Sequence, residues 1–373
     1  MGSRINISVL WLLSPDGSGL LSGGMERWCR DLASLVTAKG FEVVIYQKAT
    51  KSFSTELQDG VTVTGVPASL RFHGNFIFSR WLSRNVDRTD PMVFVSQELA
   101  LSGSFERAAA VNHGIWWDGD KPFLKRAANR LLQYRLLRHL RGVICVDTNY
   151  INWCHAELPN RQAWEHKLVY VPNYADTVAF TPGTTESSSG PLRILFPRRM
   201  PAESLERSNR GLGLLMQAAR ILEHRGMEIE LLLAGPCELQ GQIAQWKAEN
   251  GLKARIHIEE LPLDQMPTVY HSVDVVVVPT LAHEGSSLAA IEAIVSGKPV
   301  VVSHIGGLAN IVVDGLNGYV CDLSPESLAD AIERAYEEHC LSRPGLLGAV
   351  RQCFSRNRWE RRTWHHLARM LGL

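Results

Sequence analysis

Two acidic residues that could bind hydroxyl groups of one ligand, Glu284 and Glu292, are separated by seven residues. They follow the apolar run Val275 to Pro279, and Ser286 or Ser287 can cap a helix whose apolar residues then recur at helical spacing. Glu284 is therefore expected in the loop before this helix, and Glu292 on its second turn. Carboxylates in these positions can each hold a vicinal diol, while the free amides at the helix start can bind a phosphate.

The residues between the two acids supply the amides of this expected phosphate site, which are those of Gly285, Ser286, Ser287 and Leu288. A nucleotide sugar offers both phosphate and hydroxyl groups, so it suits this combination of amides and acids. A purely structural explanation stays open, in which Glu292 is an ordinary exposed residue of a helix. That explanation is the commoner one for a lone pair of acids at this spacing.

A second glycine-rich segment follows the first expected strand and ends at Gly23 and Gly24. It lacks the dinucleotide-binding fingerprint, because Ser22 stands where a third glycine is required. A helix is expected from about Met25, and its exposed amides could approach an anion, so Gly23 and Gly24 are candidate residues for binding the donor. A tight turn between strand and helix explains the two glycines equally well.

Composition limits the classes of protein to which the chain can belong. Its 373 residues are 45% hydrophobic and 21% charged, with a net charge of +1. These values predict a globular protein of two domains, and they argue against a general nucleic-acid binder, which needs an excess of cations. Seven cysteines without CxxC spacing indicate reduced thiols and a cytosolic protein. No apolar run approaches the length of a membrane span.

Short β-rich runs alternate with helical patterns along the whole chain, which predicts parallel sheets covered by helices on both faces. The expected strands of the first half are Ile5 to Leu12, Val43 to Gln47, Met92 to Val95 and Val143 to Val146. Those of the second half are Leu192 to Phe196, Glu228 to Ala234, Ile256 to Glu259, Val273 to Val278 and Pro299 to Val302.

A polar segment near the middle of the chain, 181–191, marks the expected domain boundary. We expect a Rossmann-like domain over 1–180, a linker over 181–191, a second Rossmann-like domain over 192–352, and a C-terminal helix over 353–373 that can pack back on the first domain. Two such doubly wound domains usually face a central cleft and bind ligands at the carboxyl ends of their strands. Functional residues should therefore directly follow strands.

Several motifs in order give the chain a resemblance to the family 4 glycosyltransferases, which have the GT-B fold. The motifs are Glu284 and Glu292, then Gly297, the strand Pro299 to Val302, Gly306-Gly307, the turn 313–322 and, earlier, the segment 171–182. The resemblance extends over nearly the whole chain. It implies an α/β protein that transfers a sugar from a nucleotide-diphosphate sugar, with retention of configuration and without a metal or other cofactor.

The resemblance also assigns roles to individual residues. Glu284 is expected to contact the transferred sugar and Glu292 the ribose. Arg199, which follows the strand Leu192 to Phe196, and Arg210, displaced by a longer loop, are expected to hold the diphosphate. Two fixed cations there would stabilise the charge that develops on the leaving group, although surface ion pairs are the commoner role of arginines.

His113 matches the family's histidine beside the reacting sugar, where it orients the sugar; a lone histidine is more often structural. The adjacent Trp116 and Trp117 can stack on sugar faces or fill the core. Asp118 and Asp120 spell D-x-D, a metal-binding signature of a different transferase fold. Because the doubly wound pattern does not suit that fold, no metal is expected.

The expected acceptor is a hydroxyl of a glycan or lipid-linked molecule, met by the first domain around Gly23, Gly24, Trp116 and the basic segment 123–142. Synthesis of cell-surface polysaccharide or lipopolysaccharide in the cytoplasm, at the inner face of the membrane, would supply such an acceptor. Two alternatives stay open: a sugar-nucleotide epimerase of the same architecture, and a catalytically silent subunit that binds a sugar nucleotide. The longer arginine loop and Gly285-Ser286 in place of Phe-Gly keep the second alternative open.

The segment 123–142 is expected to form a helix that contains six basic residues and no acid. An amphipathic basic helix is a candidate contact for an anionic membrane. The alternative is that the arginines form a solvated face or pair with acids on a neighbouring helix.

Overall fold

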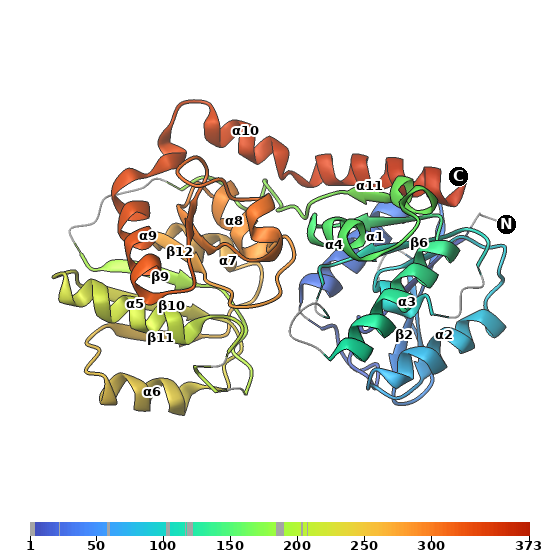
Figure 1. Cartoon of the computed structure of the whole chain (residues 1–373), viewed down its shortest axis with the longest axis horizontal. Helices are drawn as coiled ribbons and strands as arrows, with labels where there is room; N and C mark the ends of the chain where they lie inside the picture. The colour runs from blue at the N-terminus through green and yellow to red at the C-terminus, as the bar shows by residue number, and fades with distance from the viewer. Residues whose placement is uncertain are drawn as a thin grey trace. The chain divides into compact units, whose positions relative to one another are not determined.

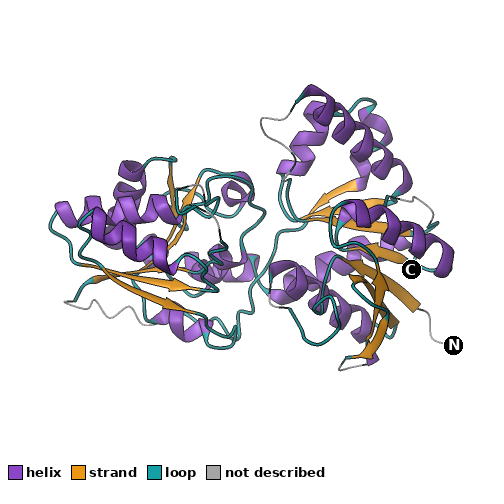
Figure 2. Ribbon diagram, turned by 90° about the horizontal axis from the view of Figure 1, so that it is seen from below, coloured by secondary structure: helices purple, strands orange, loops and turns teal. Residues whose placement is uncertain are grey.

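The computed structural model describes residues 4–21, 23–57, 60–101, 105–115, 117, 122–183, 190–202, 204–206 and 208–373. The chain forms two compact units (Figures 1 and 2). The first contains residues 1–171 and 360–373, and the second contains residues 172–359. Residues 184–189 of the expected linker lie outside the described residues.

The first unit is built on an eight-stranded sheet in the order β3-β4-β2-β1-β5-β6-β7-β8, which is parallel except for the β3–β4 pair. Its strands are β1 (Arg4–Val9), β2 (Glu42–Ala49), β3 (Phe53–Glu56), β4 (Thr62–Pro67), β5 (Met92–Phe94), β6 (Ala108–Asn112), β7 (Gly142–Cys145) and β8 (Leu168–Tyr170). β1 ends before the expected Leu12, because the amides of Leu12 and Leu13 turn to the side-chain oxygen of Gln47 at 3.0 and 2.7 Å.

Helices cover both faces of this sheet. They are α1 (Gly24–Ala38), α2 (His73–Asn85), α3 (Phe123–His139), α4 (Asn149–Glu157) and α11 (Arg356–Leu371). α2, α3 and α4 pack their buried residues into one apolar cluster. The C-terminal α11 joins the first unit, where Trp364 contacts Phe41 with ring centroids 5.7 Å apart and Arg362 donates to the Tyr170 carbonyl at 2.6 Å.

The second unit has a six-stranded parallel sheet in the order β11-β10-β9-β12-β13-β14. Its strands are β9 (Leu192–Phe196), β10 (Ile229–Ala234), β11 (Arg255–Glu259), β12 (Val275–Val278), β13 (Val300–Ser303) and β14 (Tyr319–Cys321). Its helices are α5 (Leu212–His224), α6 (Gln240–Glu249), α7 (Met266–His271), α8 (Leu288–Val295), α9 (Pro325–Glu338) and α10 (Leu346–Cys353).

Local sequence explains the strands and helices that define the second unit. The four valines of β12 are completely buried, as expected of a parallel strand covered on both faces. α9 begins where Ser324 caps the Ser327 amide at 3.1 Å and Pro325 occupies the first turn. The expected α/β architecture with two parallel-sheet units is confirmed. None of the helices in the described ranges combines the length and the hydropathy needed to cross a bilayer.

Candidate active site

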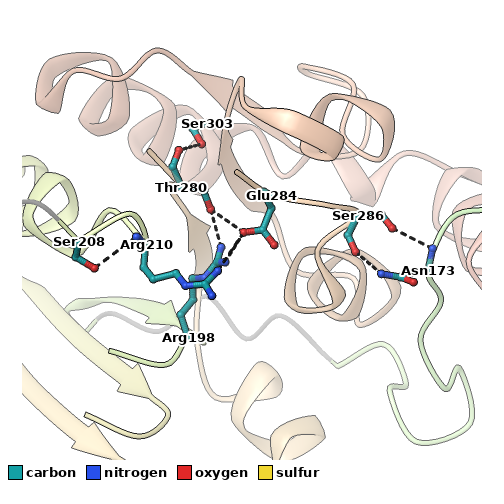
Figure 3. A network of polar contacts seen from close by, with 8 residues as sticks. All are labelled: Asn173, Arg198, Ser208, Arg210, Thr280, Glu284, Ser286 and Ser303. Atoms are coloured by element: carbon teal, nitrogen blue, oxygen red, sulfur yellow. Dashed lines mark hydrogen bonds and ion pairs between the residues drawn. The ribbon is translucent and has the colours of Figure 1, made fainter. Parts of the chain in front are cut away.

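The carboxyl ends of two neighbouring strands bring the candidate site together in the second unit. β9 and β12 pair in parallel, with Ile194 opposite Val275, so the loops that follow them meet at one edge of the sheet. The loop after β9 carries Arg198 and Arg210, and the loop after β12 carries Thr280 and Glu284. Figure 3 shows these four side chains converging.

The Glu284 carboxylate is the centre of this polar network. Arg198 forms an ion pair with its Oε2 atom and also donates to the Thr280 hydroxyl at 2.8 Å. Thr280 in turn donates to the same Oε2 at 3.1 Å, and Arg210 approaches it at 3.5 Å. Within the described residues, these contacts of Glu284 all reach Oε2. This arrangement fixes the carboxylate from one side.

Two glycines permit the backbone packing that positions this network. Gly306 has a φ of +60°, and a Cβ atom there would lie 2.2 Å from the Glu284 carbonyl oxygen. The Gly307 amide donates to that same oxygen at 2.9 Å. Gly211 has a φ of +80°, and its Cβ would lie 1.8 Å from the Pro279 carbonyl oxygen. Both positions therefore require glycine for close backbone approach.

The start of α8 is held by a residue that the sequence analysis did not single out. The Asn173 amide donates to the Ser286 hydroxyl at 3.1 Å, and its side-chain nitrogen donates to the Ser286 carbonyl at 2.7 Å. Ser286 and Ser287 are both buried. Ser287 occupies the N-cap position, but within the described residues its side chain makes no capping hydrogen bond. Asn173 thus holds the residue Ser286, which leads into α8, by two hydrogen bonds.

Glu292 lies inside the second unit, with only 6% of its surface exposed. The Tyr270 hydroxyl donates to its Oε2 at 3.2 Å and approaches the Ala289 carbonyl oxygen at 3.0 Å. The explanation of Glu292 as an exposed helical residue is therefore wrong. A buried carboxylate is costly unless hydrogen bonds or a counter-charge compensate it, and the Tyr270 hydroxyl supplies one such hydrogen bond.

The two neighbouring arginines after β9 have different surroundings. Arg198 is 8% exposed, whereas Arg199, the residue chosen from the sequence, is exposed. The Arg198 amide donates to the Phe196 carbonyl at 3.1 Å, and this tight turn accompanies the side chain's approach to Glu284. The signal available in the sequence was the pair of arginines after the strand. It did not indicate which one turns inward.

His113 and the glycine turn belong to the first unit. His113 directly follows β6, and its ring stands edge-on to Trp28 with centroids 5.5 Å apart. Burial lowers the pKa of His113 to about 4, so the ring is neutral at neutral pH. Its Nε2 atom is buried without a hydrogen-bond partner in the described part of the chain. It could therefore orient a hydroxyl group, but it carries no charge.

The remaining predicted residues of the first unit are placed as follows. Gly23 is the N-cap of α1 and Gly24 its first residue, with the cap in extended conformation. Trp117 is buried and stands edge-on to Tyr150 and Trp153. Trp116, Asp118 and Asp120 lie outside the described residues. No group of three or more His, Cys, Asp or Glu side chains in the described ranges could hold a metal ion.

Comparison with known proteins identifies the class. Residues 193–338 match the family described as glycosyl transferases group 1, and residues 23–173 match the glycosyl transferase 4-like domain. The D-inositol 3-phosphate glycosyltransferase of Corynebacterium diphtheriae is 32% identical over 377 residues, covering 87% of this chain and 84% of the relative. The protein is a glycosyltransferase. It belongs to the group 1 and 4-like glycosyltransferases, and the resemblance to family 4 is confirmed.

One further similarity covers less than half of the chain, and another concerns the fold alone. The lipopolysaccharide 1,2-N-acetylglucosaminetransferase of Salmonella typhimurium is 30% identical over 166 residues, covering 41% of this chain and 42% of the relative. The structure of Anabaena HepE in complex with UDP-glucose has a TM-score of 0.73 at 14% identity, covering 98% of this chain and 99% of that one. The expected GT-B fold is confirmed.

Proposed function

We propose that this glycosyltransferase moves a sugar from a nucleotide-diphosphate sugar to a hydroxyl group of a glycan or lipid-linked acceptor, with retention of configuration. The observation that carries the proposal is the convergence of Arg198, Arg210 and Glu284 at the carboxyl edge of the second sheet. Cations suit a diphosphate, and a carboxylate suits the hydroxyls of a sugar. The UDP-glucose in the HepE structure, which has the same fold, supports this donor class.

Each part of the donor would be bound by groups whose charge suits it. Arg198, Arg199 and Arg210 would face the diphosphate, with Arg198 contributing most because its buried side chain is fixed in place. The amides of Gly285, Ser286, Ser287 and Leu288 would add donors at the start of α8. Glu284 would use its Oε1 for a hydroxyl of the transferred sugar, and Glu292 would hold the ribose.

Cleavage of the donor bond leaves a positively charged, oxocarbenium-like sugar and a nucleoside diphosphate. Arginines beside the β-phosphate lower the barrier because they stabilise charge that grows as this bond breaks. The acceptor hydroxyl would attack on the face that the diphosphate leaves, and a departing phosphate oxygen would take its proton. Neutral His113 would orient the reacting sugar. No metal or other cofactor takes part in this scheme.

The acceptor is proposed to belong to cell-surface polysaccharide or lipopolysaccharide synthesis, on the cytoplasmic side of the membrane. The partial similarity to a lipopolysaccharide N-acetylglucosaminetransferase supports an acceptor of this class. Gly23, Gly24 and the segment 123–142 of the first unit are the proposed acceptor side. No nucleic acid is part of this function.

The test is product analysis with purified protein in EDTA. A thermal-shift screen first identifies the donor, since a ligand at ~100 times its Kd stabilises the fold by about 2.7 kcal/mol. We expect release of the nucleoside diphosphate and sugar transfer at rates that EDTA leaves unchanged. An epimerised nucleotide sugar, or donor binding without any turnover, would contradict the proposal. Loss of activity that magnesium or manganese restores would show that a metal is required.

Replacing Glu292 by Ala is expected to raise the donor Kd about tenfold and to change kcat less, because the carboxylate holds the ribose, which does not react. Calorimetric donor titration and steady-state rates measure the two effects. Tyr270→Phe is the matched control, since it removes the hydrogen bond at Oε2 but keeps the carboxylate. An unchanged donor Kd in Glu292→Ala would contradict the ribose assignment.

A further inference from the structure

An unusual share of exposed apolar surface lies on two helices of the first unit. Half of the large apolar side chains that are exposed in the described residues come from α2, α3 and the turn before α2. Five of them, at the beginnings of the two helices, form what we call the α2–α3 surface: Phe72, Phe76, Ile77, Phe123 and Leu124, each between 51% and 79% exposed. Scattered single residues need no explanation, but such a concentration marks an interaction site.

The topology places these side chains on one face and at one edge of the sheet. α2 and α3 bury Phe78, Leu82, Leu136 and Leu137 in the same apolar cluster, so both helices cover the same face. α2 follows β4 and α3 follows β6, and these strands run parallel within the sheet. The first turns of both helices, which carry the exposed apolar residues, therefore lie at its carboxyl edge.

The charged side chains of the helices α2 and α3 themselves are of one sign. Neither helix contains an aspartate or a glutamate. Exposed cations accompany the apolar residues, with Arg71 before α2 and Lys125 in the first turn of α3. A second copy of the chain seated on this surface would oppose like charges. An anionic partner with an apolar interior meets both requirements.

The structure also separates the arginines of α3 into two groups. Arg130 forms an ion pair with Glu157 of α4, and Arg126 lies 3.7 Å from the same carboxylate. The expectation of pairing with a neighbouring helix thus holds for these two. Arg135 and Arg138 are exposed on the later turns. Leu124 is 79% exposed and Phe123 is 76% exposed, so the first turn of α3 faces solvent.

We infer that the α2–α3 surface binds an anionic membrane, with its apolar side chains inserted at the headgroup boundary and Arg71 and Lys125 beside lipid phosphates. Contact with the membrane is inferred from the exposed apolar side chains and the cations of the α2–α3 surface. The purpose of this contact, access to a lipid-linked acceptor, rests on the proposed function. The apolar side chains should carry most of the binding, because cations alone are screened as the ionic strength rises.

Co-sedimentation with phosphatidylcholine vesicles, with and without phosphatidylglycerol, tests the inference at low and high salt. The parent chain should sediment with the anionic vesicles, and Phe76→Ser/Ile77→Ser should weaken this partition about tenfold or more at both salt concentrations. Arg71→Gln/Lys125→Gln should weaken it mainly at low salt. Leu263→Ser/Leu323→Ser, which removes leucines of similar exposure from the second unit, should bind as the parent does.

The inference would be overturned if the parent stayed in the supernatant with anionic vesicles at low salt. It would also be overturned if the Leu263→Ser/Leu323→Ser control lost as much vesicle binding as Phe76→Ser/Ile77→Ser. A third contradicting outcome is a parent dimer that dissociates in Phe76→Ser/Ile77→Ser. Thermal unfolding of each variant excludes misfolding as the cause. Donor turnover measured without vesicles separates the two proposals. Vesicle binding without turnover would refute the proposed function alone, and turnover without vesicle binding would refute the membrane surface alone.

Discussion

Glu284→Gln is expected to lower kcat by about a hundredfold or more while changing the donor Kd far less, because the carboxylate acts on the sugar as charge develops. The amide keeps the shape of the side chain but leaves the buried Arg198 without its counter-charge. The free energy of unfolding should therefore fall by about 1 to 3 kcal/mol. Steady-state kinetics and chemical denaturation measure the two effects separately, at a temperature where the variant is folded.

The matched control is Glu337→Gln, which removes an exposed carboxylate from α9 of the same unit. It should leave both kcat and stability close to those of the parent. The comparison with Glu292→Ala is the decisive one. Equal rates and equal donor affinities in the Glu284 and Glu292 variants would show that the two acids do not divide the sugar and the ribose between them.

Arg198→Gln is expected to cost about a hundredfold or more in kcat/KM, and Arg199→Gln considerably less. Arg198 is buried and fixed by Thr280 and Glu284 before any ligand arrives, whereas Arg199 is exposed, and a contact between charges is weaker in water than in a buried site. Arg198→Lys should also lose activity, because one ammonium group does not reproduce the fork of a guanidinium.

Kinetics with varied donor concentration, together with donor titration by calorimetry, compare the two adjacent arginines directly. Each variant is the control for the other, since both remove one charge from the same loop. A larger loss in Arg199→Gln would assign the diphosphate to the exposed residue. Equal small losses would place the phosphate contacts on Arg210 and the α8 amides instead.

The sheets were predictable where parallel strands are buried on both faces. Val275–Val278 and Leu192–Phe196 consist almost entirely of large apolar residues, and such runs indicate central strands. The strand β3, Phe53–Glu56, was missed because it is a short edge strand with exposed polar residues. β8 was missed because its three residues are only half-buried. The short edge strand β14 was also missed, because edge strands give little apolar signal in a sequence. Two interior strands were missed for another reason: β4 contains a glycine and a proline, and β6 is mainly alanine, residues that do not favour strands by type.

The predictable part of the candidate site was its order along the chain rather than its contacts. Glycines mark where backbones approach, so the Gly306-Gly307 turn could be recognised before its contact with Glu284 was known. The choice between Arg198 and Arg199 depends on one tight turn, and adjacent identical side chains give no hint of its direction. Asn173 acts across a long separation in sequence, and no local pattern connects it to Ser286.

The two hydrogen bonds from Asn173 to Ser286 connect the beginning of the second unit to the residues directly before α8. Asn173 comes two residues after Val171, where the first unit ends. Both residues belong to the second unit, so these hydrogen bonds tie the chain to that unit from its second residue onward. A rotation of the backbone before Asn173 therefore leaves the start of α8 undisturbed, whereas a rotation directly after Asn173 must move α8 or break both hydrogen bonds.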